Sequence, residues 1–300
     1  MSKESIPRKG ADPLRPVRVA VIGGSGLYRM KNVRDLVEVR VKTPFGDPSD
    51  AVFIGALSGV RCAFLPRHGR DHTLLPSELN GRANIWALKS LGVERILAFG
   101  AVGSLKASLA PRHFVFPDQL VDKTHERRST FFGEGVVAHV AFSQPFCGDL
   151  SDRLFRTARR LKIPSHRGGT YACMEGTAFS TRAESLLHRR LGYSIIGMTV
   201  VPEAKLAREA EICYAPVAMV TDYDCWKEGE EVSTEKVIAV LSANVEDAQA
   251  LIEAALPEAA ATPRSCPCVT ALRNAVMTRP EAMPKETLRK LSPIFGGRRD

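Results

Sequence analysis

The chain has 300 residues, 44% of them hydrophobic, and a mean hydropathy of −0.09, a composition typical of a globular protein that buries one large core. No apolar run approaches membrane-spanning length and the first residues lack a signal-peptide core, so we expect a cytoplasmic protein with no membrane partner. The formal net charge is +9, but the basic residues are dispersed in short clusters such as HERR and HRR, which favours a solvated surface over a nucleic-acid partner.

The first half of the chain predicts strands followed by loops rich in small residues. Residues 1–16 are polar and carry prolines, and we expect them to form a flexible tail. A helix is predicted at 78–92, where apolar residues recur at helical spacing and end at a glycine. Strands are predicted at 17–22, 51–57, 60–66, 95–105 and 113–122.

The second half alternates between the two periodicities. Helices are predicted at 148–161, 182–192, 202–211 and 234–256, and strands at 168–176, 194–200 and 213–220. This alternation predicts an α/β fold whose largely parallel sheet is covered on both faces. The main domain is expected to span 17–257, and the tail 258–300 is rich in proline and arginine.

Polar or small residues end or follow several predicted strands, and ligands bind at strand ends in such sheets. They are Gly23-Gly24-Ser25-Gly26, Arg67-His68, Gly100-Ala101 and Met198-Thr199. Hydroxyls, backbone N–H groups, the arginine fork and an added histidine donor all suit an oxyanion. The GGSG stretch lacks both the GxGxxG spacing and the P-loop lysine, which disfavours dinucleotide and triphosphate sites.

The stretch TDYDCW ends the strand predicted at 213–220 and places Asp222 two residues before Asp224. In an extended chain, side chains at i and i+2 point the same way, so both carboxyl groups can face one ligand. A solvated pair of acids in a loop is the alternative.

Seven cysteines, an odd number, do not indicate a secreted disulfide framework. Cys266-Pro267-Cys268 is the only close pair, and a single CxC provides at most half of a metal site. We therefore interpret these cysteines as structural and predict no metal.

Seven stretches carry a family resemblance across residues 17–257. They are VIGGSGL, TPFGDPSD, RHGRDHTLLPSELN, ANIWALKSLG, EGTAFSTRAES, MTVVPEAKLAREAEICYA and TDYDCWKEGEE. In these the chain resembles the 5′-methylthioadenosine phosphorylases of the trimeric purine nucleoside phosphorylase superfamily. The resemblance implies a three-layer nucleoside phosphorylase fold, with a central mixed β-sheet flanked by helices. It also implies a homotrimer in which the divergent segment 258–300, around Met283, packs on a neighbouring subunit.

The resemblance implies phosphorolysis of methylthioadenosine to adenine and 5-methylthioribose 1-phosphate. Inorganic phosphate is then a co-substrate, and no cofactor is needed. The residues implied to hold phosphate are Ser25, Arg67, His68, Gly100, Ala101 and Thr199. Those implied to bind the nucleoside are Met198, Thr221, Asp222, Asp224 and Ser180, with Thr234 and Val237 near the 5′ substituent. Gly100 and Gly197 depart from the family pattern, since some members have threonine and asparagine there.

The implied chemistry assigns catalysis to Asp222 and Asp224. Two buried aspartates repel one another, so one can keep a proton near neutral pH and donate it to the departing purine. The other can accept a hydrogen bond from a 6-amino group, which favours adenine. A preference for methylthioinosine, adenosine or 5′-deoxyadenosine remains an alternative, and a non-catalytic nucleoside-binding protein is a more remote one.

Overall fold

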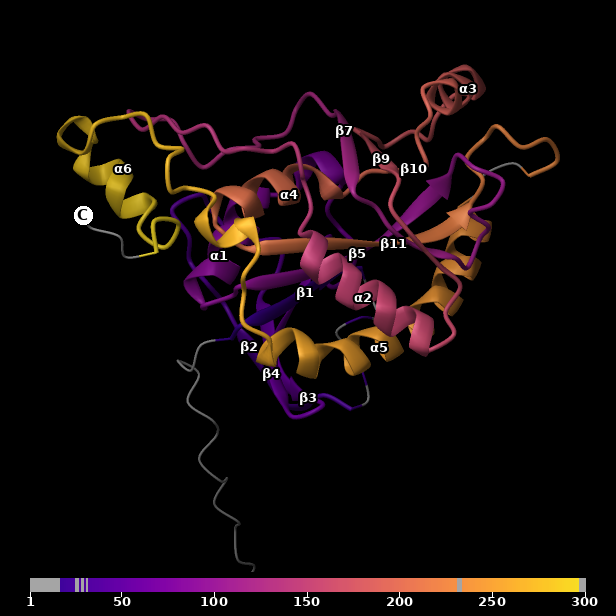
Figure 1. The fold of residues 1–300 in the computed structure, drawn as a ribbon, viewed down its shortest axis with the longest axis horizontal. Helices are drawn as coiled ribbons and strands as arrows, with labels where there is room; N and C mark the ends of the chain where they lie inside the picture. The colour runs from indigo at the N-terminus through magenta and orange to yellow at the C-terminus, as the bar shows by residue number, and fades with distance from the viewer. Residues whose placement is uncertain (1–16, 25–26, 28–29, 31, 231–233, 297–300) are drawn as a thin grey trace, which may run out of the picture.

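The computed structural model describes residues 17–24, 27, 30, 32–230 and 234–296 (Figure 1). The tail predicted at 1–16 lies outside them. The strands are β1 (Val19–Gly23), β2 (Arg34–Val39), β3 (Val52–Leu57), β4 (Val60–Pro66), β5 (Arg95–Ser104), β6 (Phe114–Phe116), β7 (Gln119–Lys123), β8 (Ser165–Arg167), β9 (Thr170–Met174), β10 (Ile195–Gly197) and β11 (Cys213–Asp222). The α-helices are α1 (Gly81–Ser90), α2 (Gly148–Arg160), α3 (Arg182–Arg190), α4 (Val200–Glu209), α5 (Thr234–Ala261) and α6 (Lys285–Lys290).

The strands form one mixed sheet in the order β2-β3-β4-β1-β5-β10-β9-β7, and β11 also pairs with β5. The central pairs β4–β1, β1–β5 and β5–β11 are parallel, so their carboxyl ends lie on the same edge. The β5–β11 register shifts between Val220 and Asp222. A bulge of this kind re-aims the side chains that follow it.

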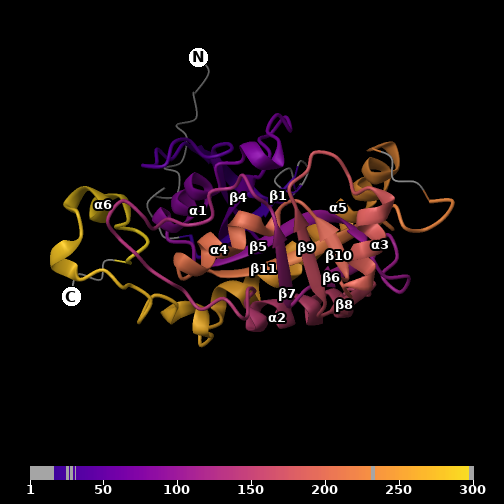
Figure 2. The same cartoon turned by 90° about the horizontal axis from the view of Figure 1, so that it is seen from above.

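Alternate residues of the central strands belong to two separate cores, because both faces of the sheet are covered. On one face Ile22, Ile96 and Tyr214 pack with residues of α1 and α4. On the other, Val21 and Leu97 pack with residues of α2 and α5. Figure 2 shows α1 and α2 on opposite sides of β5 and β11. The predicted three-layer α/β architecture is therefore confirmed.

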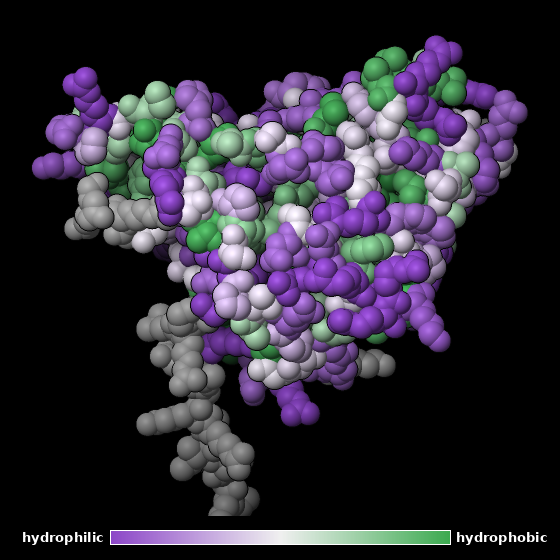
Figure 3. Space-filling view, viewed as in Figure 1, coloured by the Kyte–Doolittle hydropathy of each residue, from purple (hydrophilic) through white to green (hydrophobic). Residues whose placement is uncertain are grey.

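The outer surface over α2 and α5 is mostly hydrophilic (Figure 3). Along α2 the exposed positions include Asp152, Arg156 and Arg159, while Leu150 and Leu154 are buried. This pattern is expected of a helix with one face on a core. None of the helices in the described part of the chain combines the length and the apolar composition that spanning a bilayer requires.

The predicted elements match the observed ones closely where the apolar pattern is strong. The single strand predicted at 113–122 is wrong, because Pro117 and Asp118 separate β6 from β7 and proline cannot donate to a strand ladder. The sequence also missed β2 and β8. All of β2 but its last residue is exposed, and β8 has only three residues, so neither shows a buried pattern.

The C-terminal segment packs on its own chain. The Thr287 hydroxyl donates to the Glu134 carbonyl at 2.7 Å, and the Trp86 indole N–H donates to the Lys290 carbonyl at 2.8 Å. Helix α5 continues past the predicted boundary at 257 and includes Pro257. The boundary itself, and a role for Met283 at a neighbouring subunit, stay predictions.

Candidate active site

Arg67, directly after β4, is the centre of a buried ion-pair network. Its guanidinium is 2% exposed and donates from Nε and Nη2 to the two carboxylate oxygens of Glu203, at 2.6 and 3.0 Å. Nη1 donates to the Phe99 carbonyl at 2.6 Å, and the Tyr214 hydroxyl donates to Glu203 Oε2 at 2.7 Å. Three of the five guanidinium N–H groups are thus engaged by protein, which leaves two for a ligand.

Gly100 lies where Arg67 and Thr199 converge. A Cβ atom placed on Gly100 would lie 2.9 Å from Thr199 Oγ1 and 3.9 Å from Arg67 Nη1. A larger residue there would collide with the Thr199 hydroxyl, so the glycine keeps this approach open. Thr199 precedes α4, but its side chain does not cap the helix. The Arg67 guanidinium, the Thr199 hydroxyl and the Gly100 backbone together suit an oxyanion, and we call this group of three residues the anion cradle.

His68 is a neutral neighbour of this cradle. Burial, and then the charge of Arg67, lower the pKa of its imidazole to about 4. Nδ1 lies 2.9 Å from the Leu74 carbonyl and must carry a hydrogen to donate to it, which leaves Nε2 as an acceptor. In the sequence analysis we expected the His68 imidazole to donate a hydrogen bond to the anion, in addition to those from Arg67. The neutral ring instead suits the P–O–H group of a hydrogen phosphate.

Asp222, the last residue of β11, has both carboxyl oxygens in hydrogen bonds. The Thr221 hydroxyl donates to Oδ2 at 2.7 Å and the Asp224 backbone N–H donates to Oδ1 at 2.7 Å. Burial is the main cause that raises the pKa of Asp222 above its ordinary value. A carboxyl group with a raised pKa is suited to hold and transfer a proton near neutral pH.

Asp224 lies close to Asp222, but its backbone is not extended as the sequence analysis expected. Its φ of 49° places it in a left-handed turn beyond the end of β11, not in an extended strand. Its side chain is buried, and no group within the described residues donates to Oδ2. A buried acceptor of this kind is costly unless a ligand donates to it.

Ser180 lies beside this turn. The Cys225 thiol donates to the Ser180 carbonyl at 3.1 Å, and the Ser180 hydroxyl is buried without a partner among the described residues. Trp226 fixes the turn from the other side, since its indole N–H donates to the Ser104 carbonyl at 2.8 Å. Arg189 covers the face of that indole at 3.4 Å. The acidic turn is therefore held rigidly.

Strand β5 joins the two groups of residues. Gly103 pairs with Asp222, and a Cβ atom on Gly103 would lie 2.9 Å from Asp222 Oδ1. Gly103 lies three residues after Gly100, which corresponds to about 10 Å along a strand. The anion cradle and the aspartates thus lie along the same strand, a spacing suited to an anion bound at one position and a base bound at the other.

Gly197 is the last residue of β10 and Met198 follows it, directly before Thr199. Gly197 stands where some family members have asparagine. A Cβ atom on Gly197 would lie 2.1 Å from the Tyr171 hydroxyl, so a residue with a side chain does not fit at this position. Met198 Sδ would lie 2.6 Å from a Cβ atom on Gly176. Its sulfur therefore packs against the backbone that follows β9.

Arg127 was missed by the sequence analysis, which assigned the HERR cluster to solvated surface. Its side chain is 3% exposed and pairs with Glu175 at 2.9 Å. Its Nη1 donates to the Met198 and Val201 carbonyls, both at 2.5 Å. Arg127 thus fixes the backbone on either side of Thr199. Neither spacing nor composition distinguishes it from its exposed neighbours.

The remaining predicted residues are less closely tied to these groups. Ala101 follows Gly100 in β5 and pairs with Met219 of β11. Thr234 and Val237 lie in the first turn of α5, where Thr234 is exposed. Ser25 lies outside the described residues. Their roles stay predictions, and Glu203 and Tyr214 join the site as residues that the sequence did not single out.

Known proteins resemble this chain along most of its length. A family model described as the phosphorylase superfamily matches residues 18–257. An S-methyl-5′-thioadenosine phosphorylase of Geobacter sulfurreducens is 53% identical over 280 residues, covering 93% of this chain and 98% of the relative. One of Chloroflexus aurantiacus is also 53% identical, covering 93% and 97%.

Solved structures agree with the sequence relatives. A methylthioadenosine phosphorylase from an Antarctic soil metagenomic library superposes with a TM-score of 0.90 at 47% identity, covering 93% of this chain and 99% of that one. A methylthioadenosine phosphorylase of Schistosoma mansoni in complex with adenine gives 0.77 at 35% identity, covering 95% and 99%. The chain therefore belongs to the phosphorylase superfamily.

Proposed function

We propose that the protein catalyses phosphorolysis of S-methyl-5′-thioadenosine, giving adenine and 5-methylthioribose 1-phosphate. The observation that carries the proposal is the pairing of a buried anion cradle with a buried aspartate pair about 10 Å away along β5. The names of relatives about 50% identical over more than nine tenths of the chain support the same reaction.

Phosphate is proposed to bind between Arg67, Thr199 and the backbone at Gly100 and Ala101, with Ser25 closing the cradle. The Glu203 carboxylate balances the charge of Arg67 and fixes its fork, so the guanidinium need not reorganise when the anion binds. His68 accepts the phosphate hydrogen at Nε2. Phosphate then attacks the anomeric carbon and stabilises the positive charge that develops on the sugar.

The aspartates are proposed to act on the purine. Asp222, whose pKa is raised by burial, donates its proton to nitrogen-7 and makes adenine a better leaving group. The buried Oδ2 of Asp224 accepts from the 6-amino group, and a 6-oxo purine would present an acceptor there instead. Thr221, through its bond to Asp222 Oδ2, acts as a positioning residue.

The ribose and its 5′ substituent are proposed to bind against three side chains. Met198 packs against the ribose, and Thr234 and Val237 line the pocket for the 5′ substituent.

We infer a homotrimer in the cytoplasm with no cofactor, supported by the resemblance to trimeric phosphorylases. Figure 1 places α6 at the opposite end of the molecule from the arrowheads of β5 and β11. We therefore propose that a residue near α6 completes the site of a neighbouring subunit and not that of its own chain. Light scattering should give three times the chain mass of 32.8 kDa.

The deciding experiment is purine release with and without inorganic phosphate from methylthioadenosine, adenosine, 5′-deoxyadenosine and methylthioinosine. We expect phosphate-dependent adenine release, fastest from methylthioadenosine. Phosphate-independent release would refute the proposal that the anion cradle binds a phosphate co-substrate. A preference for methylthioinosine would refute the proposal that Asp222 and Asp224 select adenine. Release from none of them would favour a nucleoside-binding protein. Arg67→Ala should raise the phosphate concentration needed for half-maximal rate, and an unchanged requirement would place the anion elsewhere.

A further inference from the structure

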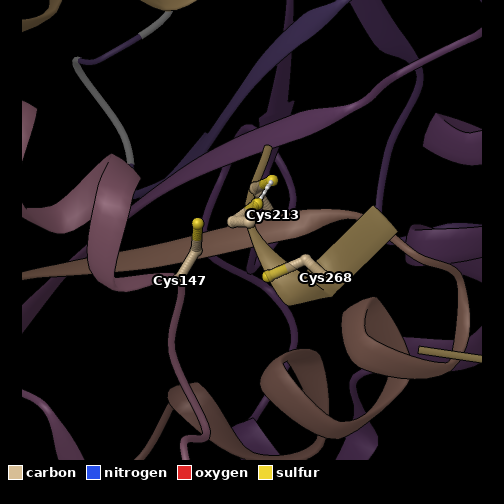
Figure 4. Close-up of side chains that lie close together, drawn as sticks. Cys147, Cys213 and Cys268 are labelled. Carbon is tan, nitrogen blue, oxygen red and sulfur yellow. Dashed lines mark hydrogen bonds between the residues drawn. The ribbon is translucent and has the colours of Figure 1, made fainter. Parts of the chain in front are cut away.

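Four of the seven cysteines gather at one point, although they are far apart in the sequence. Cys147 immediately precedes α2, Cys213 begins β11, and Cys266 and Cys268 flank Pro267 in the segment after α5. All four sulfur atoms lie within 4.8 Å of one another. Figure 4 shows Cys147, Cys213 and Cys268 converging from three separate segments. The CxC pair, interpreted from sequence as half of a site at most, thus meets two further sulfur ligands.

The spacing of the sulfurs fits a single tetrahedral ion. A Zn–S bond is about 2.3 Å, so the sulfurs of a Zn(Cys)4 centre lie about 3.8 Å apart. The Cys213 and Cys266 sulfurs are 3.3 Å apart, and the widest pair is within 4.8 Å. Closing on an ion therefore requires shifts of about 1 Å or less. A set of four cysteine thiolates favours zinc among the common divalent ions, because zinc accepts four sulfur ligands in structural sites.

The surroundings also suit such a centre. Cys147, Cys213 and Cys268 are each 3% exposed or less, while Cys266 is half-buried and is the most solvent-accessible of the four. A zinc ion with four thiolates carries a net charge of −2, which needs a nearby cation. The buried guanidinium of Arg208 lies close enough to Cys268 to interact with its charge.

The backbone already holds the ligands in place. The Cys147 N–H donates to the Tyr214 carbonyl and the Cys213 N–H to the Glu94 carbonyl, both at 2.9 Å. The segment that carries the CxC pair is held by Arg264, which donates to the Glu211 carbonyl at 2.8 Å. A pre-formed arrangement lowers the ordering cost of binding.

We propose that Cys147, Cys213, Cys266 and Cys268 bind one zinc ion that fixes the C-terminal segment to the start of β11. Binding converts four thiols to thiolates and releases their protons. All four positions are protein ligands, so the centre is structural and leaves no open position for catalysis. It lies at the opposite end of β11 from Asp222, about 30 Å away for a strand of this length. This departs from the prediction of no metal, because the two distant cysteines complete the site.

The first test is the metal content of protein purified under reducing conditions without chelator. We expect about one zinc per chain in the wild type and a loss of most of it in Cys268→Ser, because three thiolates bind zinc far more weakly than four. The matched control is Cys62→Ser, which removes a thiol that is equally buried but outside the cluster. The control should keep its zinc. Equal zinc in the two variants would refute the site.

A second test uses the wild type alone, in case Cys268→Ser does not fold. Titration with an organomercurial should release zinc to a chromogenic indicator, and the metal-free protein should unfold at a lower temperature. Trypsin should then cleave it faster after Arg264 and Arg273. Cobalt(II) added to the metal-free protein should give the intense visible bands of a tetrahedral thiolate site. Zinc-free wild type, with all thiols free or with a disulfide in the cluster, would overturn the proposal, as would iron in place of zinc.

Discussion

Replacing Asp222 with asparagine tests the proposed proton donor with little disturbance of the fold. Asparagine keeps one carboxamide oxygen to accept from the Asp224 N–H, which now bonds to Asp222 Oδ1 at 2.7 Å. Its amide nitrogen would face the Thr221 hydroxyl, which can accept from it while donating to the Val102 carbonyl. No buried group is left without a partner, so the free energy of unfolding should change by less than about 1 kcal/mol.

The rate should change far more than the stability. Loss of a general acid typically reduces the rate by a factor of about 100 to 10,000, which is about 3 to 5 kcal/mol of transition-state stabilisation. Binding of the nucleoside should be nearly unchanged, because the amide N–H can still donate to nitrogen-7. The loss should therefore appear in kcat and not in KM for Asp222→Asn.

The assay is the pH dependence of kcat for wild type and Asp222→Asn with saturating phosphate. The protonated carboxyl is the active form, so the wild-type rate should fall as pH rises through the raised pKa of Asp222. The variant has no such group and should lack this decline. A kcat within threefold of wild type, or an unchanged decline at high pH, would refute the assignment of Asp222 as the acid.

Three further substitutions test buried charged side chains, two beside the site and one, Glu209, at the opposite end of α4 from Thr199. Glu203→Gln leaves Arg67 without its counter-charge and should cost about 3 to 5 kcal/mol of stability in urea unfolding; a cost below about 1 kcal/mol would contradict the buried pair. Arg127→Lys keeps the charge but not the fork that binds the Met198 carbonyl, so it should raise KM for both substrates, and unchanged kinetics would exclude a positioning role. Burial raises the pKa of Glu209 to about 7, so wild-type stability should fall by up to about 3 kcal/mol from pH 4.5 to 7. Glu209→Gln cannot ionise and should show a smaller fall in melting temperature over that range, whereas an equal fall would contradict the raised pKa.

Most of the fold could be predicted from the local spacing of apolar residues. β3 and β4 coincide with the predicted apolar runs apart from Ala51, and α1 and α3 lie inside predicted helices, because their apolar periodicity reflects burial directly. The sequence analysis also selected Arg67, Thr199 and Asp222 as ligand-binding candidates because they lie at the ends of predicted strands. The carboxyl ends of parallel strands share one edge of the sheet, where ligands bind. The resemblance then gave these residues their implied roles.

Other features depend on contacts between segments that no local pattern reveals. Glu203 is separated from Arg67 by 136 positions, and their pairing arises only when α4 packs beside the end of β4. The same holds for Arg127, which looks like a surface arginine until it meets the carbonyl groups of two strand ends. Charge alone does not tell a buried guanidinium from an exposed one.

The sequence by itself determined the layered α/β architecture and the two chemical groups at its strand ends, because burial and strand direction leave periodic and positional signals along the chain. The tertiary structure alone decided how the side chains within each group are arranged. The bulge before Asp222 and the left-handed turn at Asp224 aim the two carboxyl groups, and chain packing gathers Cys147 and Cys213 around the CxC pair. Such convergence depends on long-range packing, in which residues far apart in sequence become neighbours.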